Sequence, residues 1–352
     1  MSKSKRPNAS RKGNGRKSVK QTIEELLDRT GGVSSGEVAR AAGITRQAAH
    51  YHLSRMTAAG LLSSTGARRG TRYARATLFS RSYRLAGLSE DSAWSDVAPE
   101  LTNLEIDSNA ISIQKYVFTE MLNNAIDHSE SASAEVSLWA ASPSPVRFQI
   151  SDYGVGVFAN VARHLRLESP FDAIQELTKG KVTTMPERHS GEGIFFSSKV
   201  VDVFWLESNG LRWTVDNLRA DHAVGEVPKS PGTLVGWELM LQPSRTLADV
   251  FEAFTHPESL AFSRTMTQVK LLETAAGFVS RSEAKRIGRG LDRFDDVTLD
   301  FQGVTEIGQG FVDELFRVWQ RDNPSTRLRV INASPVVAKM IERGLAGEAG
   351  QT

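Results

Sequence analysis

Three polar residues at helical spacing mark the first candidate site. Glu120, Asn124 and Asp127 stand at positions i, i+4 and i+7 of the segment FTEMLNNAIDHS, so they share one face of an otherwise apolar helix. Polar groups that turn toward a protein interior need partners, because burial without a hydrogen bond costs free energy. Taken alone, the pattern also fits an ordinary half-buried helix.

Two glycine-containing segments follow this helix. Asp152, Gly154 and Gly156 come directly after the strand-like run VRFQIS, where glycines let the backbone approach a ligand. Further on, Gly191 and Gly193 precede an apolar helix, a layout that suits amide N–H groups placed against phosphates. Each segment is weak alone, but the three in this order predict a nucleotide site.

These residues resemble the motifs of the GHKL (histidine kinase-like) ATPase family over residues 103–245. Glu120 and Asn124 match its N box, and Gly232-Thr233 resembles its terminal GT pair. The two glycine boxes correspond to Asp152, Gly154, Gly156, Gly191 and Gly193.

The resemblance implies that the region binds ATP with Mg²⁺. It implies that Asp152 accepts a hydrogen bond from the adenine amino group and that Asn124 is a magnesium ligand. Glu120 would be the catalytic residue that orients or deprotonates the attacking water. The implied chemistry is consistent, since Mg²⁺ prefers oxygen ligands and phosphoryl transfer depends on positioning and charge neutralisation.

The segment LTKGKVTTMPERHS between the glycine boxes would form the lid of the site. Its cations Lys179, Lys181 and Arg188 are available to phosphates, although they also fit solvated loop positions. The sequence departs from the family pattern at Phe195, which replaces the third glycine of the second glycine box. Asp127 stands where many histidine kinases carry Lys or Arg, which favours hydrolysis of ATP over protein phosphorylation.

Charge is distributed unevenly along the chain. Residues 1–75 contain 16 Lys or Arg and 4 Asp or Glu, whereas the remainder contains 27 and 37. A basic head on an acidic body indicates a polyanionic partner, for which we expect nucleic acid. Together with the segment that follows, this predicts double-stranded DNA as the partner. Residues 1–19 have almost no apolar side chains and predict a disordered basic arm. The alternative of a solubilising tail would explain the basic residues of this arm but not those of residues 20–75.

Residues 20–75 predict three short helices and a hairpin. QTIEELLDRT forms the first helix, Ser35 caps the second, and Thr45 caps the third, which begins RQAAHYHL. The stretch resembles winged helix-turn-helix domains of bacterial repressors, which also serve as docking modules. The resemblance places Arg46, Gln47, His50 and Tyr51 at base edges. The residues expected near phosphates are Arg55, Arg68, Arg69 and Arg72.

The last part of the chain alternates helix-like and strand-like runs, which predicts a small α/β domain. VTLDFQGVTEIGQGFVDELF resembles the strand, loop and helix of STAS domains over residues 262–346; any short α/β module also fits. The family's phosphoacceptor loop corresponds to Gly308, Gln309 and Gly310. Gln309 has no hydroxyl, although Thr305 lies close by, so the resemblance implies a protein-interaction domain that is not phosphorylated at the usual position.

Together these patterns predict an α+β multidomain protein with a winged helix, a GHKL α/β sandwich and a small STAS-like domain. Residues 76–102 would be a linker and residues 246–260 another connection. The absence of Cys and of any apolar run near the roughly 18 residues of a membrane span predicts a cytoplasmic protein without a membrane partner.

The predicted function is a DNA-binding transcriptional regulator in which ATP binding acts as a switch, with a homodimer as a possible form. One alternative is an anti-sigma-type serine/threonine protein kinase that acts on a partner protein. Another is a nucleotide-gated scaffold with negligible turnover. An autophosphorylating histidine kinase is disfavoured, because residues 76–110 contain no His.

Overall fold

The computed structural model describes residues 18–104, 106–140, 145–182, 191–256, 258, 261–269, 278 and 280–346. Most of the predicted basic arm lies outside these residues, as do Arg188 and His189. The chain divides into two compact units: Met1–Thr77 with Trp139–Pro143, and Leu78–Leu138 with Ser144–Thr352.

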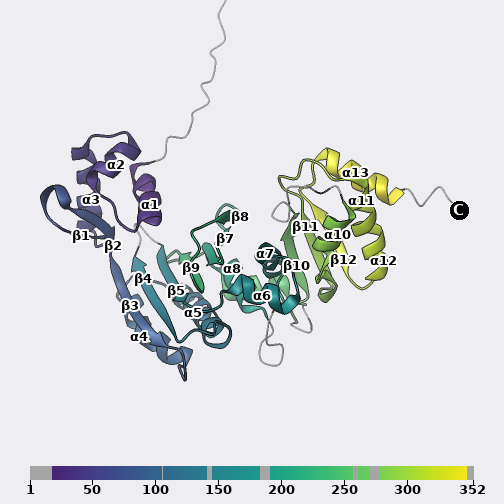
Figure 1. Ribbon diagram of the computed structural model, residues 1–352, viewed down its shortest axis with the longest axis horizontal. Coiled ribbons are helices and arrows are strands. Elements are labelled where there is room, and N and C mark those ends of the chain that lie inside the picture. Colours follow the sequence, from purple (N-terminus) through teal and green to yellow (C-terminus); the bar gives the residue numbers. More distant parts are fainter. Residues whose placement is uncertain are drawn as a thin grey trace, which may run out of the picture. The chain divides into compact units, whose positions relative to one another are not determined.

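The N-terminal unit contains the predicted three helices and hairpin (Figure 1). They are α1 (Val19–Thr30), α2 (Ser35–Ala42) and α3 (Arg46–Ala58), followed by the antiparallel strands β1 (Leu62–Thr65) and β2 (Arg72–Arg75). Thr45 caps α3 as predicted, but Ser34 rather than Ser35 caps α2, because Ser34 and Glu37 form a capping box. The helices and hairpin share a small core built from Ile23, Leu27, Val38, Ala49, Leu53, Leu62 and Tyr73.

The predicted linker over residues 76–102 was wrong. It forms strand β3 (Thr77–Arg84) and helix α4 (Glu90–Thr102). The helix buries Ala93, Trp94, Val97 and Leu101, whose spacing is that of a helical stripe. Pro99 hides the pattern, since an internal proline normally argues against a helix.

A seven-stranded sheet forms the centre of the second unit. Its strand order is β3-β4-β5-β9-β6-β7-β8, and the pairs from β5 to β8 are antiparallel. The strands after β3 are β4 (Ser133–Ala140), β5 (Val146–Asp152), β6 (Val203–Ser208), β7 (Leu211–Asp216), β8 (Asp221–Glu226) and β9 (Thr233–Leu239).

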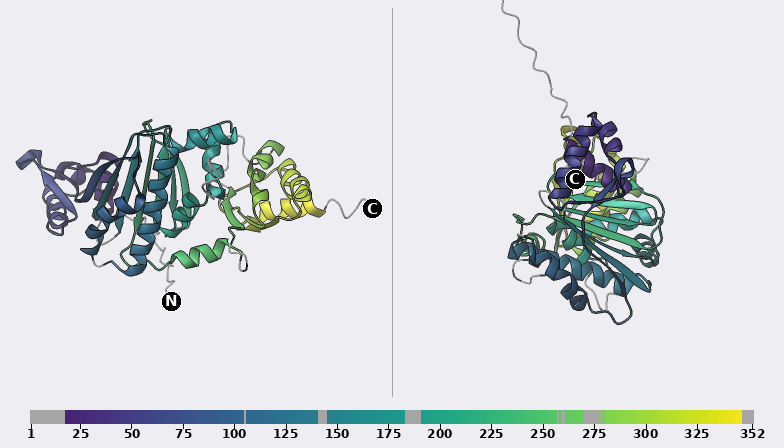
Figure 2. Two further views of the ribbon diagram at one scale, coloured as in Figure 1. Left: turned by 90° about the horizontal axis from the view of Figure 1, so that it is seen from below. Right: turned by 90° about the vertical axis from the view of Figure 1, so that its left-hand side faces the viewer.

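Helices cover one face of this sheet. Helix α5 (Ser108–His128) packs on β5 and β9, and the right-hand view of Figure 2 shows it beside α4 along the sheet. Helix α6 (Val157–Leu165) and helix α8 (Gly193–Val200) pack on β6, and helix α7 (Pro170–Lys179) packs on β7. The sheet and helices therefore form two layers with the core between them.

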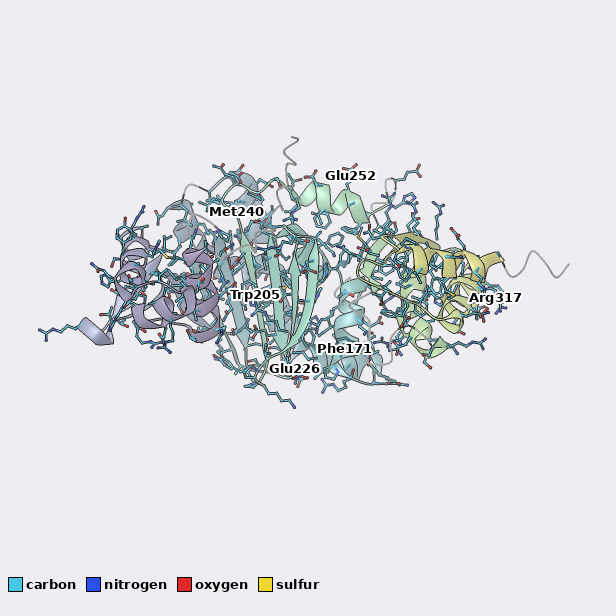
Figure 3. All side chains as sticks on the ribbon, turned by 90° about the horizontal axis from the view of Figure 1, so that it is seen from above. Phe171, Trp205, Glu226, Met240, Glu252 and Arg317 are labelled. Carbon is cyan, nitrogen blue, oxygen red and sulfur yellow. The ribbon has the colours of Figure 1, made fainter. Side chains whose placement is uncertain are left out.

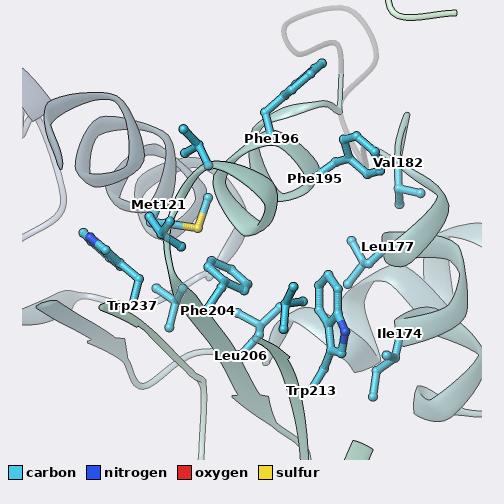
Figure 4. Packing of buried hydrophobic residues seen from close by; sticks show 14 of the residues in the cluster. Met121, Ile174, Leu177, Val182, Phe195, Phe196, Phe204, Leu206, Trp213 and Trp237 are labelled. Atoms are coloured by element: carbon cyan, nitrogen blue, oxygen red, sulfur yellow. The ribbon is translucent and has the colours of Figure 1, made fainter. Parts of the chain in front are cut away.

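Aromatic side chains fill this core. Phe148 on β5 stacks on Trp237 of β9 with ring centroids 5.1 Å apart, and the indole N–H of Trp237 donates to Gln114 of α5 at 2.7 Å. Figure 4 shows Trp237, Phe204 and Met121 in this layer. A buried indole that has found an acceptor supports a single orientation of α5 on the sheet.

The predicted connection over residues 246–260 was also wrong in part, because it contains helix α9 (Leu247–Phe254). The helix begins with a capping box between Thr246 and Asp249, a helix-start signal that was present in the sequence.

The C-terminal domain, which we define as β10 through α13, has three parallel strands in the order β10-β11-β12. The strands are β10 (Arg264–Gln268), β11 (Asp296–Asp300) and β12 (Arg327–Ile331). The helical segments between and after them are α10 (Arg281–Gly288), η3 (Leu291–Arg293), α11 (Gln309–Val312), a π-helical segment η4 (Asp313–Trp319), α12 (Gln320–Asp322) and α13 (Pro335–Ala346). Figure 3 shows Arg317 of η4 among the side chains of this domain. The structure combines helices and sheets, with a helical N-terminal domain, a large central sheet and a small C-terminal domain. The predicted α+β multidomain class is confirmed at this level.

Candidate functional site

A cavity of about 250 Å³ lies between α5, the sheet and the start of α8. Its volume is slightly below the roughly 300–1,000 Å³ that ligand pockets occupy. The lining includes six of the predicted nucleotide-site residues: Glu120, Asn124, Asp152, Gly191, Gly193 and Thr233. Four segments far apart in the sequence therefore meet at one cavity.

Asp152 stands at the end of β5, where the strand delivers it to the cavity. Its Oδ1 accepts the backbone N–H groups of Gly154 at 2.9 Å and Thr233 at 3.3 Å. Burial raises the pKa of this carboxyl, while these donors act in the opposite direction. Asp152 is thus a buried hydrogen-bond acceptor that two backbone N–H groups hold in place, and these hydrogen bonds favour its ionised form.

Thr233 connects this acid to the next helix. The Thr233 hydroxyl accepts the backbone N–H of Val157, the first residue of α6, at 2.9 Å. It also hydrogen-bonds the Asp152 side chain. Because an ionised carboxylate can only accept, the Thr233 hydroxyl is the donor in this bond. The Gly-Thr pair therefore positions Asp152 from the neighbouring strand β9.

Glu120 and Gly193 lie in direct contact at the start of α8. A Cβ atom at position 193 would fall 2.1 Å from Oε2 of Glu120, so a larger residue would require the carboxylate to move. Gly191 is held by its backbone: its carbonyl accepts the N–H of Val182 at 3.1 Å, and its φ of +74° is in the left-handed region. The glycines thereby bring the start of α8 to the cavity, and the first N–H groups of a helix have no partner within the helix.

Asn124 is the residue of this site with an unmet hydrogen bond. Its amide nitrogen is buried and has no partner among the described residues. A buried polar group left unpaired costs about 1–3 kcal/mol, and a ligand in the cavity would supply the missing partner. Within the described residues there is no cluster of three or more His, Cys, Asp or Glu that could hold a metal. A cation here would depend on phosphate oxygens, on water and on the amide oxygen of Asn124, which are ligands that Mg²⁺ prefers. The unpartnered amide nitrogen of Asn124 is a donor, so it would pair with an oxygen of the ligand.

The structure places five predicted nucleotide-site residues elsewhere. Asp127 lines a separate surface pocket with Arg163 and Arg166. Gly154 and Gly156 pack closely against other parts of the protein and do not line the cavity. A Cβ at position 154 would fall 1.7 Å from the Ser129 carbonyl oxygen, and a Cβ at position 156 would fall 2.4 Å from the Ser208 hydroxyl. Lys179 and Lys181 bond to backbone carbonyls of the C-terminal domain instead of lining the cavity.

Several lining residues were missed from the sequence. Asn160 of α6 reaches the cavity, and its amide donates to the His128 carbonyl at 3.1 Å. Glu192, between the two glycines of the second box, also lines it. The apolar wall comes from Met121, Ala125, Ile150, Val157, Val161, Leu177, Val182, Ile194, Leu206 and Val235. The alternation along β5 and β9 was a usable signal for Ile150 and Val235.

The predicted recognition helix presents its candidate side chains to solvent. Arg46, Gln47, His50, Tyr51 and Arg55 of α3 are all exposed, and 58% of the Tyr51 surface is accessible. The Arg55 guanidinium lies over the Tyr51 ring, 5.8 Å from its centroid.

The wing differs from its prediction at Arg72. The Arg72 guanidinium bonds to the Gly32 carbonyl and lies 3.7 Å from Glu37. This side chain therefore ties the hairpin to the turn before α2 instead of pointing away from the domain. Arg68 is exposed on the turn between β1 and β2, and the Arg69 side chain lies outside the described set.

In the C-terminal domain, the loop expected to correspond to the phosphoacceptor segment lies before α11. Gly308 is the residue preceding this helix, and Gln309 and Gly310 form its first turn. The carboxamide at position 309 offers no hydroxyl for phosphorylation.

Family comparisons agree with the two ends of the chain. Residues 22–65 match a family model described as a helix-turn-helix domain, and residues 283–338 match one described as a STAS-like domain of unknown function (DUF4325). No curated protein and no solved structure matches the chain. None of the helices in the described ranges has the length and apolar character needed to cross a membrane. The chain thus carries an N-terminal helix-turn-helix domain, which indicates DNA-binding regulation, and a C-terminal STAS-like domain compatible with it.

Proposed function

We propose that this protein is a DNA-binding transcriptional regulator whose central cavity binds ATP with Mg²⁺ and acts as its switch. The observation that carries the nucleotide assignment is the meeting of Glu120, Asn124, Asp152, Gly193 and Thr233 around one cavity. The helix-turn-helix match carries the DNA-binding part.

The cavity offers a separate environment for each part of a nucleotide. Apolar side chains such as Ile150, Leu206 and Val235 would pack on the base, and Asp152 would accept its amino group. The start of α8 would face the phosphates, because unpaired N–H groups and the positive end of the helix dipole favour anions. Few polar groups in a mainly apolar pocket are typical of specific ligand sites.

Within this proposal, Asn124 would hold Mg²⁺, which neutralises phosphate charge when bound. Glu120 would orient or deprotonate a water near the terminal phosphate, and contact with Gly193 would keep its carboxylate in place. Asp152 and Thr233 would hold the base end of the nucleotide.

Nucleotide binding is tested with Asp152→Asn and a fluorescent ATP analogue. The carboxamide retains the size of the side chain but replaces one acceptor with a donor, so binding should be lost. Asp221→Asn is the matched control, since Asp221 is exposed on β8 away from the cavity and should leave the affinity unchanged. Equal affinities of the wild type and Asp152→Asn would refute the assigned site.

The fate of the γ-phosphate separates the regulator from the alternative kinase. With γ-labelled ATP and Mg²⁺, a hydrolysing switch releases free phosphate, whereas a protein kinase transfers the label to a partner protein. A nucleotide-gated scaffold gives neither product. Glu120→Ala should retain binding and lose turnover; a variant with wild-type turnover would contradict the role of Glu120.

A further inference from the structure

The segment at the base of the predicted lid has two functional faces. We define the lid-base segment as residues 176–182, from the last turn of α7 to the end of the described chain before Gly191. On one face, Leu177 and Val182 line the nucleotide cavity. Figure 4 shows Leu177 and Val182 among the packed hydrophobic side chains that include Phe195. The backbone bond between Val182 and Gly191 joins the segment to the second glycine box.

On the other face, Lys179 is fully buried against the C-terminal domain. Its ammonium group has three acceptors: Glu176 Oε1 at 2.8 Å, the Arg289 carbonyl at 2.8 Å and the Arg286 carbonyl at 3.3 Å. An ammonium group has three N–H donors, so all are used. Burial lowers the pKa of Lys179, and the Glu176 charge opposes that change.

The two carbonyls that Lys179 contacts lie at the C-terminal end of α10. The last carbonyls of a helix lack partners within the helix, and the helix dipole makes this end negative. Lys179 therefore caps a helix of the C-terminal domain with a charge that comes from the nucleotide-binding region. Removing it would leave these carbonyls without this donor and Glu176 without one of its two cationic partners.

A second set of bonds runs in both directions across the same interface. Lys181 donates to the Arg293 carbonyl at 2.7 Å, and the Arg293 guanidinium donates back to the Lys181 carbonyl at 2.7 Å. Arg293 also reaches Glu176 at 3.2 Å, and the Thr265 hydroxyl of β10 donates to the Lys179 carbonyl at 2.6 Å. The backbone of the lid-base segment is thus bonded directly to the C-terminal domain.

The backbone conformation of the lid-base segment brings it close to Phe262, which precedes β10. Gly180 and Lys181 have φ angles of +88° and +54°, and a Cβ at position 180 would fall 2.7 Å from the Phe262 ring. Phe195, which replaces the third family glycine, lies 4.8 Å from Phe262 between ring centroids. Phe195 therefore lies where the nucleotide-binding region meets the chain leading into β10.

We propose that the C-terminal domain is an internal effector of the nucleotide cavity, acting through the lid-base segment. Docking holds Leu177 and Val182 in the cavity wall through Lys179, Lys181 and Arg293. Because linkage is reciprocal, docking strengthens nucleotide binding and bound nucleotide strengthens docking by the same factor. The inference rests on the proposed nucleotide function and gives the STAS-like domain a role within its own chain.

The test compares two variants that weaken docking with a matched control, all in the full chain. Arg293→Gln removes the guanidinium bonds to Lys181 and Glu176, and Lys181→Met keeps the aliphatic side chain but removes its bond to Arg293. Arg329→Gln is the control, because Arg329 pairs with Asp296 inside the C-terminal domain and makes no bond to the segment. Circular dichroism first establishes that each variant is folded.

Affinity for the fluorescent ATP analogue should fall about five-fold or more in Arg293→Gln and Lys181→Met, the usual lower range of coupling between sites. Arg329→Gln should bind like the wild type. In the wild type, the analogue should also slow amide hydrogen exchange across residues 286–293, and this protection should be lost in Arg293→Gln.

The outcomes separate the two proposals. If the wild type binds the analogue and both docking variants bind with equal or higher affinity, the coupling is refuted while the nucleotide site stands. If the wild type binds no nucleotide, the proposed function fails and the coupling fails with it.

Discussion

At the scale of single residues, the contact between Gly193 and Glu120 gives the sharpest steric expectation. In Gly193→Ala the new Cβ would fall 2.1 Å from Oε2 of Glu120, so the carboxylate must move. Under the proposed mechanism, a misplaced water-positioning group lowers turnover more than binding, since positioning accounts for much of phosphoryl-transfer catalysis. We expect ATPase kcat to drop by about ten-fold or more while analogue affinity changes little.

Gly225→Ala serves as the matched control for this prediction. Gly225 lies on β8, and a Cβ there would meet nothing within 4 Å, so both turnover and affinity should remain at wild-type values. Undiminished turnover in Gly193→Ala would show that the position of the Glu120 carboxylate does not limit the reaction.

At the scale of elements, α8 and β8 carry two partly buried basic groups, Lys199 and His222, which interact electrostatically. Burial lowers the pKa of Lys199 to about 8, and burial together with the Lys199 charge lowers the pKa of His222 to about 3. His222 Nδ1 has no hydrogen-bond partner among the described residues. Both groups therefore favour their neutral forms in the folded state more than they do in the unfolded chain.

The sign of the resulting pH dependence follows from the direction of these shifts. An unfolded histidine titrates near pH 6.5, so below that pH the unfolded state binds the proton that folded His222 resists. The free energy of unfolding should therefore decrease as the pH falls from 7 to 5. Lys199 does not contribute to the pH dependence between pH 7 and pH 5. Below its folded-state pKa of about 8 it is charged in both the folded and the unfolded state, so its effect on the free energy of unfolding no longer changes with pH.

His222→Gln should flatten this dependence, since the variant has no proton to bind at that position. Urea unfolding at pH 7 and pH 5 measures the difference for each protein. The exposed His164→Gln is the control and should lose as much stability as the wild type. An equal loss in His222→Gln would show that His222 is not the group responsible.

Helix α3 carries a separate prediction about DNA. Replacing both Arg46 and Gln47 with Ala removes two exposed side chains at the start of the proposed recognition helix, where base contacts are typically made. Each good base contact contributes about 1–3 kcal/mol of discrimination, so selected DNA should be bound at least ten-fold more weakly by the double variant. Filter binding or fluorescence anisotropy with a selected sequence measures the change.

Arg29→Ala, at the exposed end of α1, is the control for the recognition helix. It removes a cation of the same domain without touching α3. If the double variant keeps the affinity and sequence preference of the wild type, α3 is not the reading element.

Elements with strong local signals could be predicted from the sequence, whereas tertiary choices could not. Gly43 marked the end of α2, and Thr45 marked the start of α3. The Asp152 and Gly193 motifs marked residues that do meet at the cavity. Lys179 could not be placed, because only the fold shows that α10 carbonyls offer its ammonium group a better environment than solvent. Helix α4 was missed because Pro99 and its mixed composition obscured the buried stripe.

At the scale of the whole molecule, the chain separates its charge by function. The first 75 residues carry 16 basic and 4 acidic side chains, and the remainder carries 27 and 37. Attraction of the basic part to phosphates releases counterions, which makes binding steeply dependent on salt. The acidic remainder repels DNA, so binding should be confined to residues 1–75.

The last prediction concerns residues 1–17, which contain seven Lys or Arg and no acid. Deleting them should weaken binding to selected and random DNA by similar factors, because interactions with phosphates carry no sequence information. The slope of log K against log salt should become shallower by about 0.9 for each phosphate that the shortened protein no longer neutralises. Replacing the seven cations with Gln should act like the deletion, which separates charge from chain length. An unchanged slope in both variants would mean that these cations do not bind phosphates, and that α3 and the wing supply the whole electrostatic contribution.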